Sequence, residues 1–235
     1  MLLMNSIAAI AEDRAPPLSF LLREAGALVN LRWKSLLART TPAQSSGEGR
    51  PVMVIPGLLS SDRSTVVMRR MLRTHGYRAY GWSLGINRGV SASLLERAEA
   101  ELERIASRRG KVTLIGWSLG GLYAREIAKR RPDLVNRVIT LGSPFSGDIH
   151  ANNAWRLYEM VNDHKVDNPP IDARVHEKPP VPTIALWSRK DGIVAPACAR
   201  GLEGECDRTV EVDCTHIGFM AEPCALQAVL EVLKD

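Results

Sequence analysis

Short apolar runs alternate with longer amphipathic stretches along most of the chain. The short runs are apolar on both faces, which is typical of strands in a parallel sheet that helices cover on both sides. The pattern therefore predicts an α/β domain with a mostly parallel central sheet and helices on both of its faces. Ser93 and Glu96 form a capping box that predicts the start of one helix. The predicted strands are residues 51–56, 77–82, 111–116, 137–142, 183–187 and, more weakly, 209–213, and the predicted helices are residues 61–75, 93–105, 119–131 and 221–233.

Two segments depart from this alternation. Within residues 1–49, positions 18–39 have apolar residues at helical spacing and a basic side, and a polar linker follows. This pattern predicts an amphipathic helix that packs on the domain, with peripheral membrane contact as the alternative. Within the main domain at 50–235, residues 143–182 contain no clear strand and become rich in proline. Because long insertions in compact domains are usually functional, we expect a small helical cap or lid there.

The pentapeptide Gly-Trp-Ser-Leu-Gly occurs twice, at residues 81–85 and 116–120. Both copies match G-x-S-x-G, in which a nucleophilic serine sits on a sharp turn between a strand and a helix. The second copy follows a predicted strand and precedes a predicted helix, whereas loop-forming residues follow the first copy. We therefore predict that Ser118 is the nucleophile and that Ser83 has a structural role.

A serine hydroxyl needs a base to accept its proton and a third group to orient that base. Among the five histidines, His216 alone lies beyond the last predicted strand. Asp191 follows the strand at 183–187 and is the preferred acid, while Asp148 is the competing choice. The chain order of serine, aspartate and histidine is the order that this arrangement requires. The predicted catalytic residues are thus Ser118, Asp191 and His216.

The predicted oxyanion hole consists of two backbone N–H groups. One belongs to Leu119, directly after the predicted nucleophile. The other comes from the loop after the strand at 51–56, where Leu58 is preferred and Leu59 is the alternative.

With these residues in place, the chain resembles the α/β-hydrolase superfamily over residues 50–235. The residues Gly-Trp-Ser-Leu-Gly-Gly at 116–121, together with the aspartate and histidine after later strands, carry the resemblance. Residues 142–147 look like the T-L-G-S-P-H-x-G stretch of bacterial lipases and esterases, with Phe145 where histidine is common. Residues 80–89 are similar to a segment of bacterial α/β-hydrolases whose substrates are mostly unassigned. The resemblance implies bacterial esterase-like or lipase-like serine chemistry. The superfamily usually has two strands before the one at 51–56, and here the N-terminal helix takes their place.

Such a triad performs acyl transfer, and hydrolysis of a carboxylic ester is the predicted reaction. An acyltransferase with the same triad and a non-catalytic binding protein of this fold are the alternatives. A small-molecule or lipid-like ester would suit an apolar pocket. The residues expected to line that pocket are Leu58, Trp117, Phe145, Trp155, Met160 and Phe219.

Composition, charge and motif content bear on the expected partners, cofactors and cellular compartment. The chain has 235 residues, 45% hydrophobic and 24% charged, which fits one globular domain. Its net charge of +5 comes from scattered basic residues without a dense stripe, so no nucleic-acid partner is expected. Neither a nucleotide-binding motif nor a metal-ligand spacing occurs, so no cofactor or metal is expected. Reduced thiols in a cytoplasmic or membrane-associated protein are favoured, while secretion, oligomeric state and disulfides stay open for Cys198, Cys206, Cys214 and Cys224.

Overall fold

The computed structural model describes the main domain almost completely and the N-terminal segment in part. The described residues are 15–17, 19–20, 23–24, 26–27, 47–148, 152–153, 159 and 174–234. Within the predicted N-terminal helix, the described residues from 19 to 27 are helical. Residues 28–46 and most of the predicted cap lie outside the described residues, so the cap stays a prediction.

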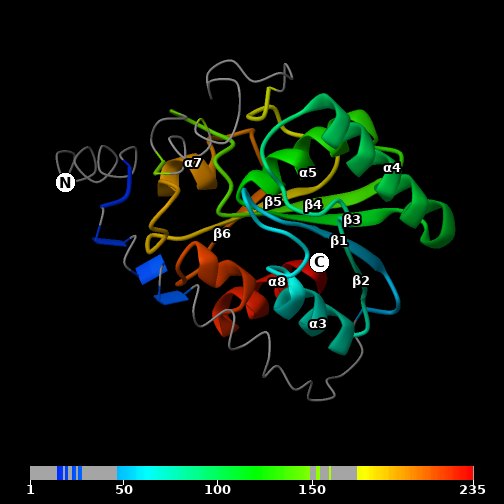
Figure 1. The fold of residues 1–235 in the computed structure, drawn as a ribbon, viewed down its shortest axis with the longest axis horizontal. Helices are drawn as coiled ribbons and strands as arrows, with labels where there is room; N and C mark the ends of the chain where they lie inside the picture. The colour runs from blue at the N-terminus through cyan, green and yellow to red at the C-terminus, as the bar shows by residue number, and fades with distance from the viewer. Residues whose placement is uncertain are drawn as a thin grey trace.

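Six strands form one sheet in which every neighbouring pair is parallel (Figure 1). Their spatial order is β2-β1-β3-β4-β5-β6. Among the described residues, the first strand in the chain, β1, thus lies second in the sheet, next to the edge strand β2. The arrangement confirms the α/β fold class predicted from the apolar runs. The strands are β1 (Pro51–Ile55), β2 (Arg78–Gly81), β3 (Val112–Trp117), β4 (Val135–Leu141), β5 (Thr183–Trp187) and β6 (Arg208–Glu211).

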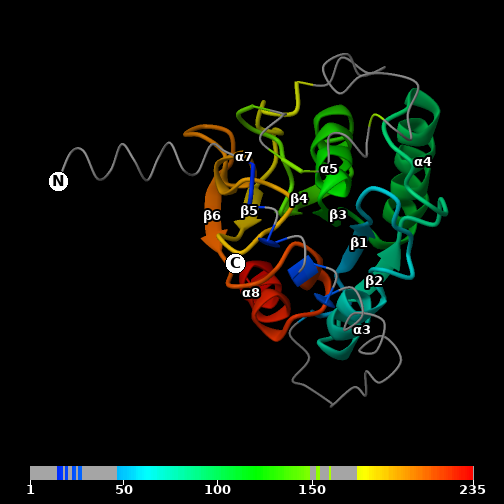
Figure 2. The ribbon, with the colours of Figure 1, turned by 60° about the vertical axis from the view of Figure 1, so that its left-hand side comes forward.

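Helices cover both faces of this sheet. Helices α4 and α5 lie on one face, and α3 and α8 lie on the other (Figures 1 and 2). The short helix α7 lies beside the β5–β6 end of the sheet (Figure 2). The helices are α3 (Val66–Thr74), α4 (Ala92–Arg109), α5 (Leu119–Arg130), α7 (Pro196–Arg200) and α8 (Pro223–Lys234).

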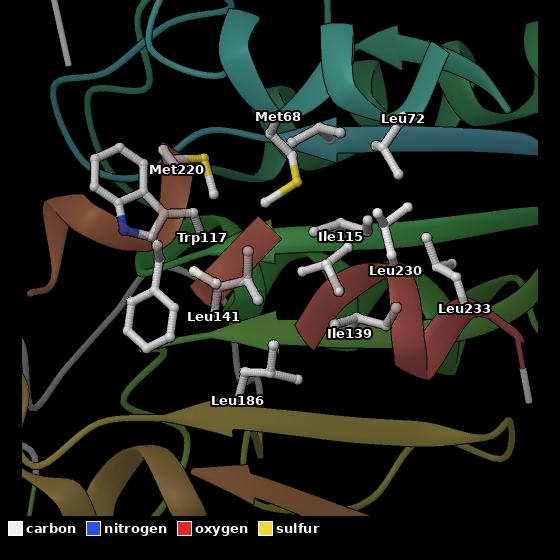
Figure 3. Packing of buried hydrophobic residues seen from close by; sticks show 14 of the residues in the cluster. Met68, Leu72, Ile115, Trp117, Ile139, Leu141, Leu186, Met220, Leu230 and Leu233 are labelled. Atoms are coloured by element: carbon white, nitrogen blue, oxygen red, sulfur yellow. The ribbon is translucent and has the colours of Figure 1, made fainter. Parts of the chain in front are cut away.

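The core on the α3/α8 face extends to the edge of the sheet that carries the predicted site. Aliphatic side chains of the central strands meet those of α3 and α8 there, and Trp117 and Met220 lie at one end of the same cluster (Figure 3). Burial of apolar surface contributes about 25 cal/mol per Å², so this packing holds the strand ends firmly. The buried side chains that meet include Ile115, Ile139, Met68, Leu72, Leu230 and Leu233.

Two helix starts differ from the sequence prediction. The capping box at Ser93 is wrong, because the N-cap of α4 is Ser91, whose side chain accepts a hydrogen bond from the Leu94 amide at 3.2 Å. Ser91 has extended backbone, as an N-cap residue requires, whereas Ser93 already lies inside the helix. Helix α3 begins at Val66 because turns occupy residues 62–65.

Two further features concern the cysteines and the length of the apolar helices. All four cysteines lie in the described part of the chain, and none of them forms a disulfide. Among the described residues, no helix combines the length and the apolar character needed to cross a membrane.

Candidate active site

Ser118 lies on the turn between β3 and α5, at the carboxyl end of a central strand. Its backbone has φ 53° and ψ −124°, a strained conformation for a residue with a side chain. Glycines make this turn sterically feasible. A Cβ at Gly116 would overlap the Gly120 carbonyl, and a Cβ at Gly120 would overlap the Ile55 carbonyl of β1. The second Gly-Trp-Ser-Leu-Gly copy therefore has the strand, turn and helix that a nucleophile elbow needs.

His216 and Asp191 form a buried pair at the same edge of the sheet. The Nδ1 atom of His216 lies 2.7 Å from Oδ2 of Asp191, and both side chains are buried. The other carboxylate oxygen accepts hydrogen bonds from the Ile193 and Val194 amides, each at 2.8 Å. The competing acid Asp148 is exposed, so the structure pairs the histidine with Asp191.

Gly142, which follows β4 at φ 54°, leaves room for this pair. A Cβ at that position would lie 2.9 Å from Oδ2 of Asp191 and 3.1 Å from Nδ1 of His216. The glycine of the Gly142–Gly147 segment, which resembled a lipase motif, thus has a steric reason to be a glycine.

The electrostatic environment favours the charged form of His216. Burial acts to lower the pKa of the imidazole, but the Asp191 carboxylate and its hydrogen bond, together with the Glu24 carboxylate, outweigh it. The pKa of His216 therefore lies above its ordinary value. A raised pKa makes the neutral imidazole a stronger proton acceptor, and the same interactions stabilise the imidazolium that forms when it takes a proton from a nucleophile.

Trp117 connects the elbow with the histidine. Its indole Nε1–H donates a hydrogen bond to the His216 carbonyl at 3.0 Å, and the two rings lie 5.7 Å apart between centroids. Since Trp117 directly precedes Ser118, the loop that carries His216 is tied to the residue next to the predicted nucleophile.

The loop after β1 lies against Ser118. A Cβ at Gly57 would lie 3.1 Å from the Ser118 Cβ, so the predicted oxyanion loop closely approaches the elbow. The amide of Leu59 donates to the Asn87 carbonyl at 2.6 Å, which leaves Leu58 as the better candidate donor in this loop. Leu119 is the first residue of α5, where amides have no acceptor within the helix.

The described residues contain no group of three or more His, Cys, Asp or Glu side chains placed to bind a metal ion. The arrangement instead combines a strained serine, a histidine–carboxylate pair and backbone donors at one sheet edge. Residues 78–168 match the protein-family model described as alpha/beta hydrolase fold. The chain therefore has the α/β-hydrolase fold.

Two curated proteins are similar to parts of this chain. A pimeloyl-[acyl-carrier protein] methyl ester esterase of Aliivibrio fischeri is 30% identical over 120 residues, which cover 50% of this chain and 46% of the relative. A biotin biosynthesis bifunctional protein of Teredinibacter turnerae is 41% identical over 59 residues, 25% of this chain and 10% of that protein. The matches thus span less than half the length of either relative.

Solved structures share the fold over most of the chain. A monoacylglycerol lipase of Paleococcus ferrophilus has a TM-score of 0.56 at 19% identity, covering 79% of this chain and 96% of its own. A pyrethroid hydrolase of Sphingobium faniae has a TM-score of 0.56 at 17% identity, covering 78% and 97%. A thioesterase domain from the curacin biosynthetic pathway has a TM-score of 0.53 at 14% identity, covering 82% and 93%. At these identities the likeness shows the fold.

Two buried polar residues of the site were missed by the sequence analysis. Asn87 is buried, and its side-chain amide donates to the Pro56 carbonyl at 2.9 Å, so it holds the predicted oxyanion loop from outside. The only signal in the sequence was a polar residue, Asn87, next to an apolar one, Ile86, in a loop. In the structure the usual burial of the two is reversed, with Asn87 buried and Ile86 exposed. Glu24, from the N-terminal segment, is buried beside the histidine loop, and its sequence context carried no signal for that contact.

The residues predicted to line a substrate pocket lie in different environments. Phe145 is buried beneath the guanidinium of Arg125, which lies 4.1 Å from the ring centroid. Phe219 is fully buried in the core, and Trp117 is mostly buried beside the histidine. Trp155 and Met160 lie outside the described residues. The pocket assignment as a whole stays a prediction.

Proposed function

We propose that this α/β-hydrolase cleaves carboxylic esters through an acyl-enzyme intermediate on Ser118. The observation that carries the proposal is the buried 2.7 Å contact between His216 and Asp191, joined through Trp117 to the strained serine turn. The names of the curated esterase and of the solved lipase support ester hydrolysis as the reaction class.

In the first half of the proposed reaction, the Ser118 hydroxyl attacks the ester carbonyl carbon. His216 accepts the hydroxyl proton on Nε2, because its Nδ1 atom faces Asp191. The carbonyl oxygen becomes an oxyanion that accepts hydrogen bonds from the Leu58 and Leu119 amides. When the tetrahedral intermediate collapses, the carbon–oxygen bond to the alcohol breaks and the imidazolium returns the proton to the leaving alcohol.

In the second half, water attacks the acyl-enzyme and His216 again accepts the proton. Collapse of the second tetrahedral intermediate releases the carboxylic acid and restores the Ser118 hydroxyl. Asp191 keeps the imidazole in one tautomer and stabilises its charged form during both halves. The apolar residues predicted around the site (Trp117, Phe145, Trp155, Met160 and Phe219) favour an acyl chain or a hydrophobic alcohol as the recognised group.

Labelling with a fluorophosphonate tests this proposal, because such probes react with activated serines. We expect one covalent adduct per chain, mapped to Ser118 by peptide mass spectrometry. A parallel series of p-nitrophenyl esters from acetate to palmitate should show hydrolysis with a preference for one range of acyl length. Added methanol would reveal acyl transfer as methyl ester product. An adduct on Ser83, or no adduct and no turnover by folded protein, would contradict the proposal.

A further inference from the structure

Glu24 lies far from the proposed catalytic residues in sequence but is buried against the loops that carry two of them. Its side chain comes from the helical N-terminal segment and is 4% exposed. Its Oε1 atom accepts hydrogen bonds from the amides of Gly192 at 3.0 Å and His216 at 2.7 Å. Its Oε2 atom accepts one from the amide of Ile217 at 2.9 Å. One carboxylate therefore binds three backbone N–H groups on two separate loops.

The amides that Glu24 binds belong to the loops that carry the proposed catalytic acid and base. Gly192 directly follows Asp191, and His216 is the proposed base itself. Hydrogen bonds to a carboxylate are roughly twice as strong as those between neutral groups, so the carboxylate fixes the relative position of the two loops. A displacement of either loop would change the contact between the imidazole and Asp191, on which the proposed mechanism depends.

Two other described residues of the N-terminal segment, Pro16 and Phe20, also contact the active-site loops. A Cβ at Gly192 would lie 2.8 Å from the Phe20 carbonyl oxygen and 3.1 Å from the Glu24 Cγ, so only a glycine allows this approach. Asn153 donates from its side-chain amide to the Pro16 carbonyl at 3.0 Å and to the Gly192 carbonyl at 2.9 Å. The described part of the segment therefore packs on the active-site loops.

We propose that Glu24 is a positioning residue of the active site, which holds the Asp191 and His216 loops together and stabilises the imidazolium formed during turnover. The inference rests on the proposed ester hydrolysis for its kinetic consequences. It also makes the N-terminal segment part of the catalytic apparatus, because the triad's support is incomplete without it.

The charged surroundings of His216 set the direction of the expected effect. Asp191 faces the imidazole, and Glu24 faces the backbone on the N-terminal side. Glu222 of the following turn accepts a hydrogen bond from Thr215 at 3.3 Å, and the neighbouring Cys214 is buried with a raised pKa caused by that burial. Since Asp191 and Glu24 both raise the pKa of His216, removal of the charge at position 24 lowers that pKa.

The substitution Glu24→Gln tests the inference, because it keeps one acceptor oxygen and removes the charge. We expect kcat for p-nitrophenyl butyrate to fall about tenfold to a hundredfold with KM little changed, since the loops shift relative to the bound ester. The acid limb of kcat/KM should move to lower pH, because the Glu24 charge that helps to raise the pKa of His216 is removed. Glu24→Ala should lower kcat further, and Glu96→Gln, which removes one charge from the exposed side of α4, should match wild type.

An NMR titration of the His216 imidazole gives a readout that does not depend on turnover. In Glu24→Gln the imidazole should titrate at lower pH than in wild type, whereas a merely structural role for Glu24 would leave the midpoint unchanged. Wild-type kcat together with an unchanged titration would overturn the inference. Absence of ester hydrolysis by wild type would overturn the proposed function instead, and the titration would still decide the effect of Glu24. If Glu24→Ala does not fold, the Gln variant and its titration decide.

Discussion

The two Gly-Trp-Ser-Leu-Gly copies both have a serine with positive φ, but the two serines have different surroundings. Ser83 has φ 62° and Ser118 has φ 53°, and each follows a strand that pairs with β1. The positive φ is therefore a property of the shared pentapeptide and does not by itself mark a nucleophile. The copies diverge directly afterwards, because α5 begins at the residue after Ser118, whereas turns follow Ser83 until α4 begins at Ala92.

The two serines have similar φ angles, but different side chains and loops lie next to them. Beside Ser83, the Asp62 carboxylate accepts hydrogen bonds from the amides of Trp82 at 3.0 Å and Ser83 at 3.1 Å. That carboxylate opposes the growth of a second negative charge at the same place. Beside Ser118 lies the Gly57 loop, and the neighbouring Trp117 donates a hydrogen bond to the His216 carbonyl. Reactivity thus depends on groups that distant parts of the chain bring to the turn.

The largest expected effect comes from removing each hydroxyl in turn. Ser118→Ala should lower kcat for p-nitrophenyl butyrate by about 10⁴-fold or more, since the nucleophile and base act as a unit. Ser83→Ala should stay within about twofold of wild type, because its hydroxyl has no role in the proposed reaction. Steady-state kinetics on both variants, with circular dichroism as a folding control, check the comparison. Greater loss in Ser83→Ala would reverse the assignment of the two copies.

Substitutions of Asp191, which contacts His216, and of Asp62, which contacts the first copy, should affect different properties. The first should lower activity and the second should lower stability. Asp191→Asn should lower kcat by about 10³-fold to 10⁴-fold, because the amide no longer holds the required imidazole tautomer. Asp62→Asn should destabilise the fold by about 1–3 kcal/mol, since one amide N–H loses its acceptor, while the turnover of the folded fraction stays near wild type. Urea unfolding and initial rates measured on the same samples distinguish the two effects. Equal kinetic losses in both variants would mean that the first copy also contributes to the reaction.

Much of the fold was predictable because its signals are local. Apolar runs revealed most of the strands, since strands covered on both faces have no polar side. The signal for β6 was weaker, because that strand is polar and largely exposed. The contact between His216 and Asp191 was also predictable, because parallel strands bring their carboxyl ends to one edge of the sheet. Strand ends from distant parts of the sequence therefore meet without any local signal being needed for the contact itself.

The supporting polar residues could not be predicted in the same way. Glu24 bonds to amides 168 to 193 positions away, and nothing in residues 18–39 distinguishes it from a solvent-exposed glutamate of an amphipathic helix. Asn87 holds a loop 31 positions earlier. Ser91 was overlooked for Ser93 because both are capping residues, and only the extended backbone at Ser91 decides between them. Partners of buried polar groups are set by tertiary packing, which local patterns do not contain.

Substitution of the last glycine of each copy, Gly85 or Gly120, is expected to lower stability to different extents. A Cβ at Gly120 would overlap the Ile55 carbonyl oxygen and lie 2.7 Å from that of Pro56, and backbone atoms cannot move aside. At Gly85 no atom lies within 4 Å of such a Cβ, but φ is 79°, so an alanine there would carry backbone strain alone.

Gly120→Ala should therefore destabilise the protein by about 3 kcal/mol or more through overpacking at the elbow. Gly85→Ala should cost only about 1–2 kcal/mol, the usual penalty for a left-handed alanine. For a domain of this size, the smaller cost corresponds to a fall in Tm of about 2–8 °C. Thermal unfolding of the two variants beside wild type measures both costs, and ester hydrolysis should survive in Gly85→Ala. Equal losses of stability in the two alanine variants would show that tight packing at Gly120 does not distinguish the second copy from the first. The difference between the copies would then depend only on the side chains and loops that lie next to each serine.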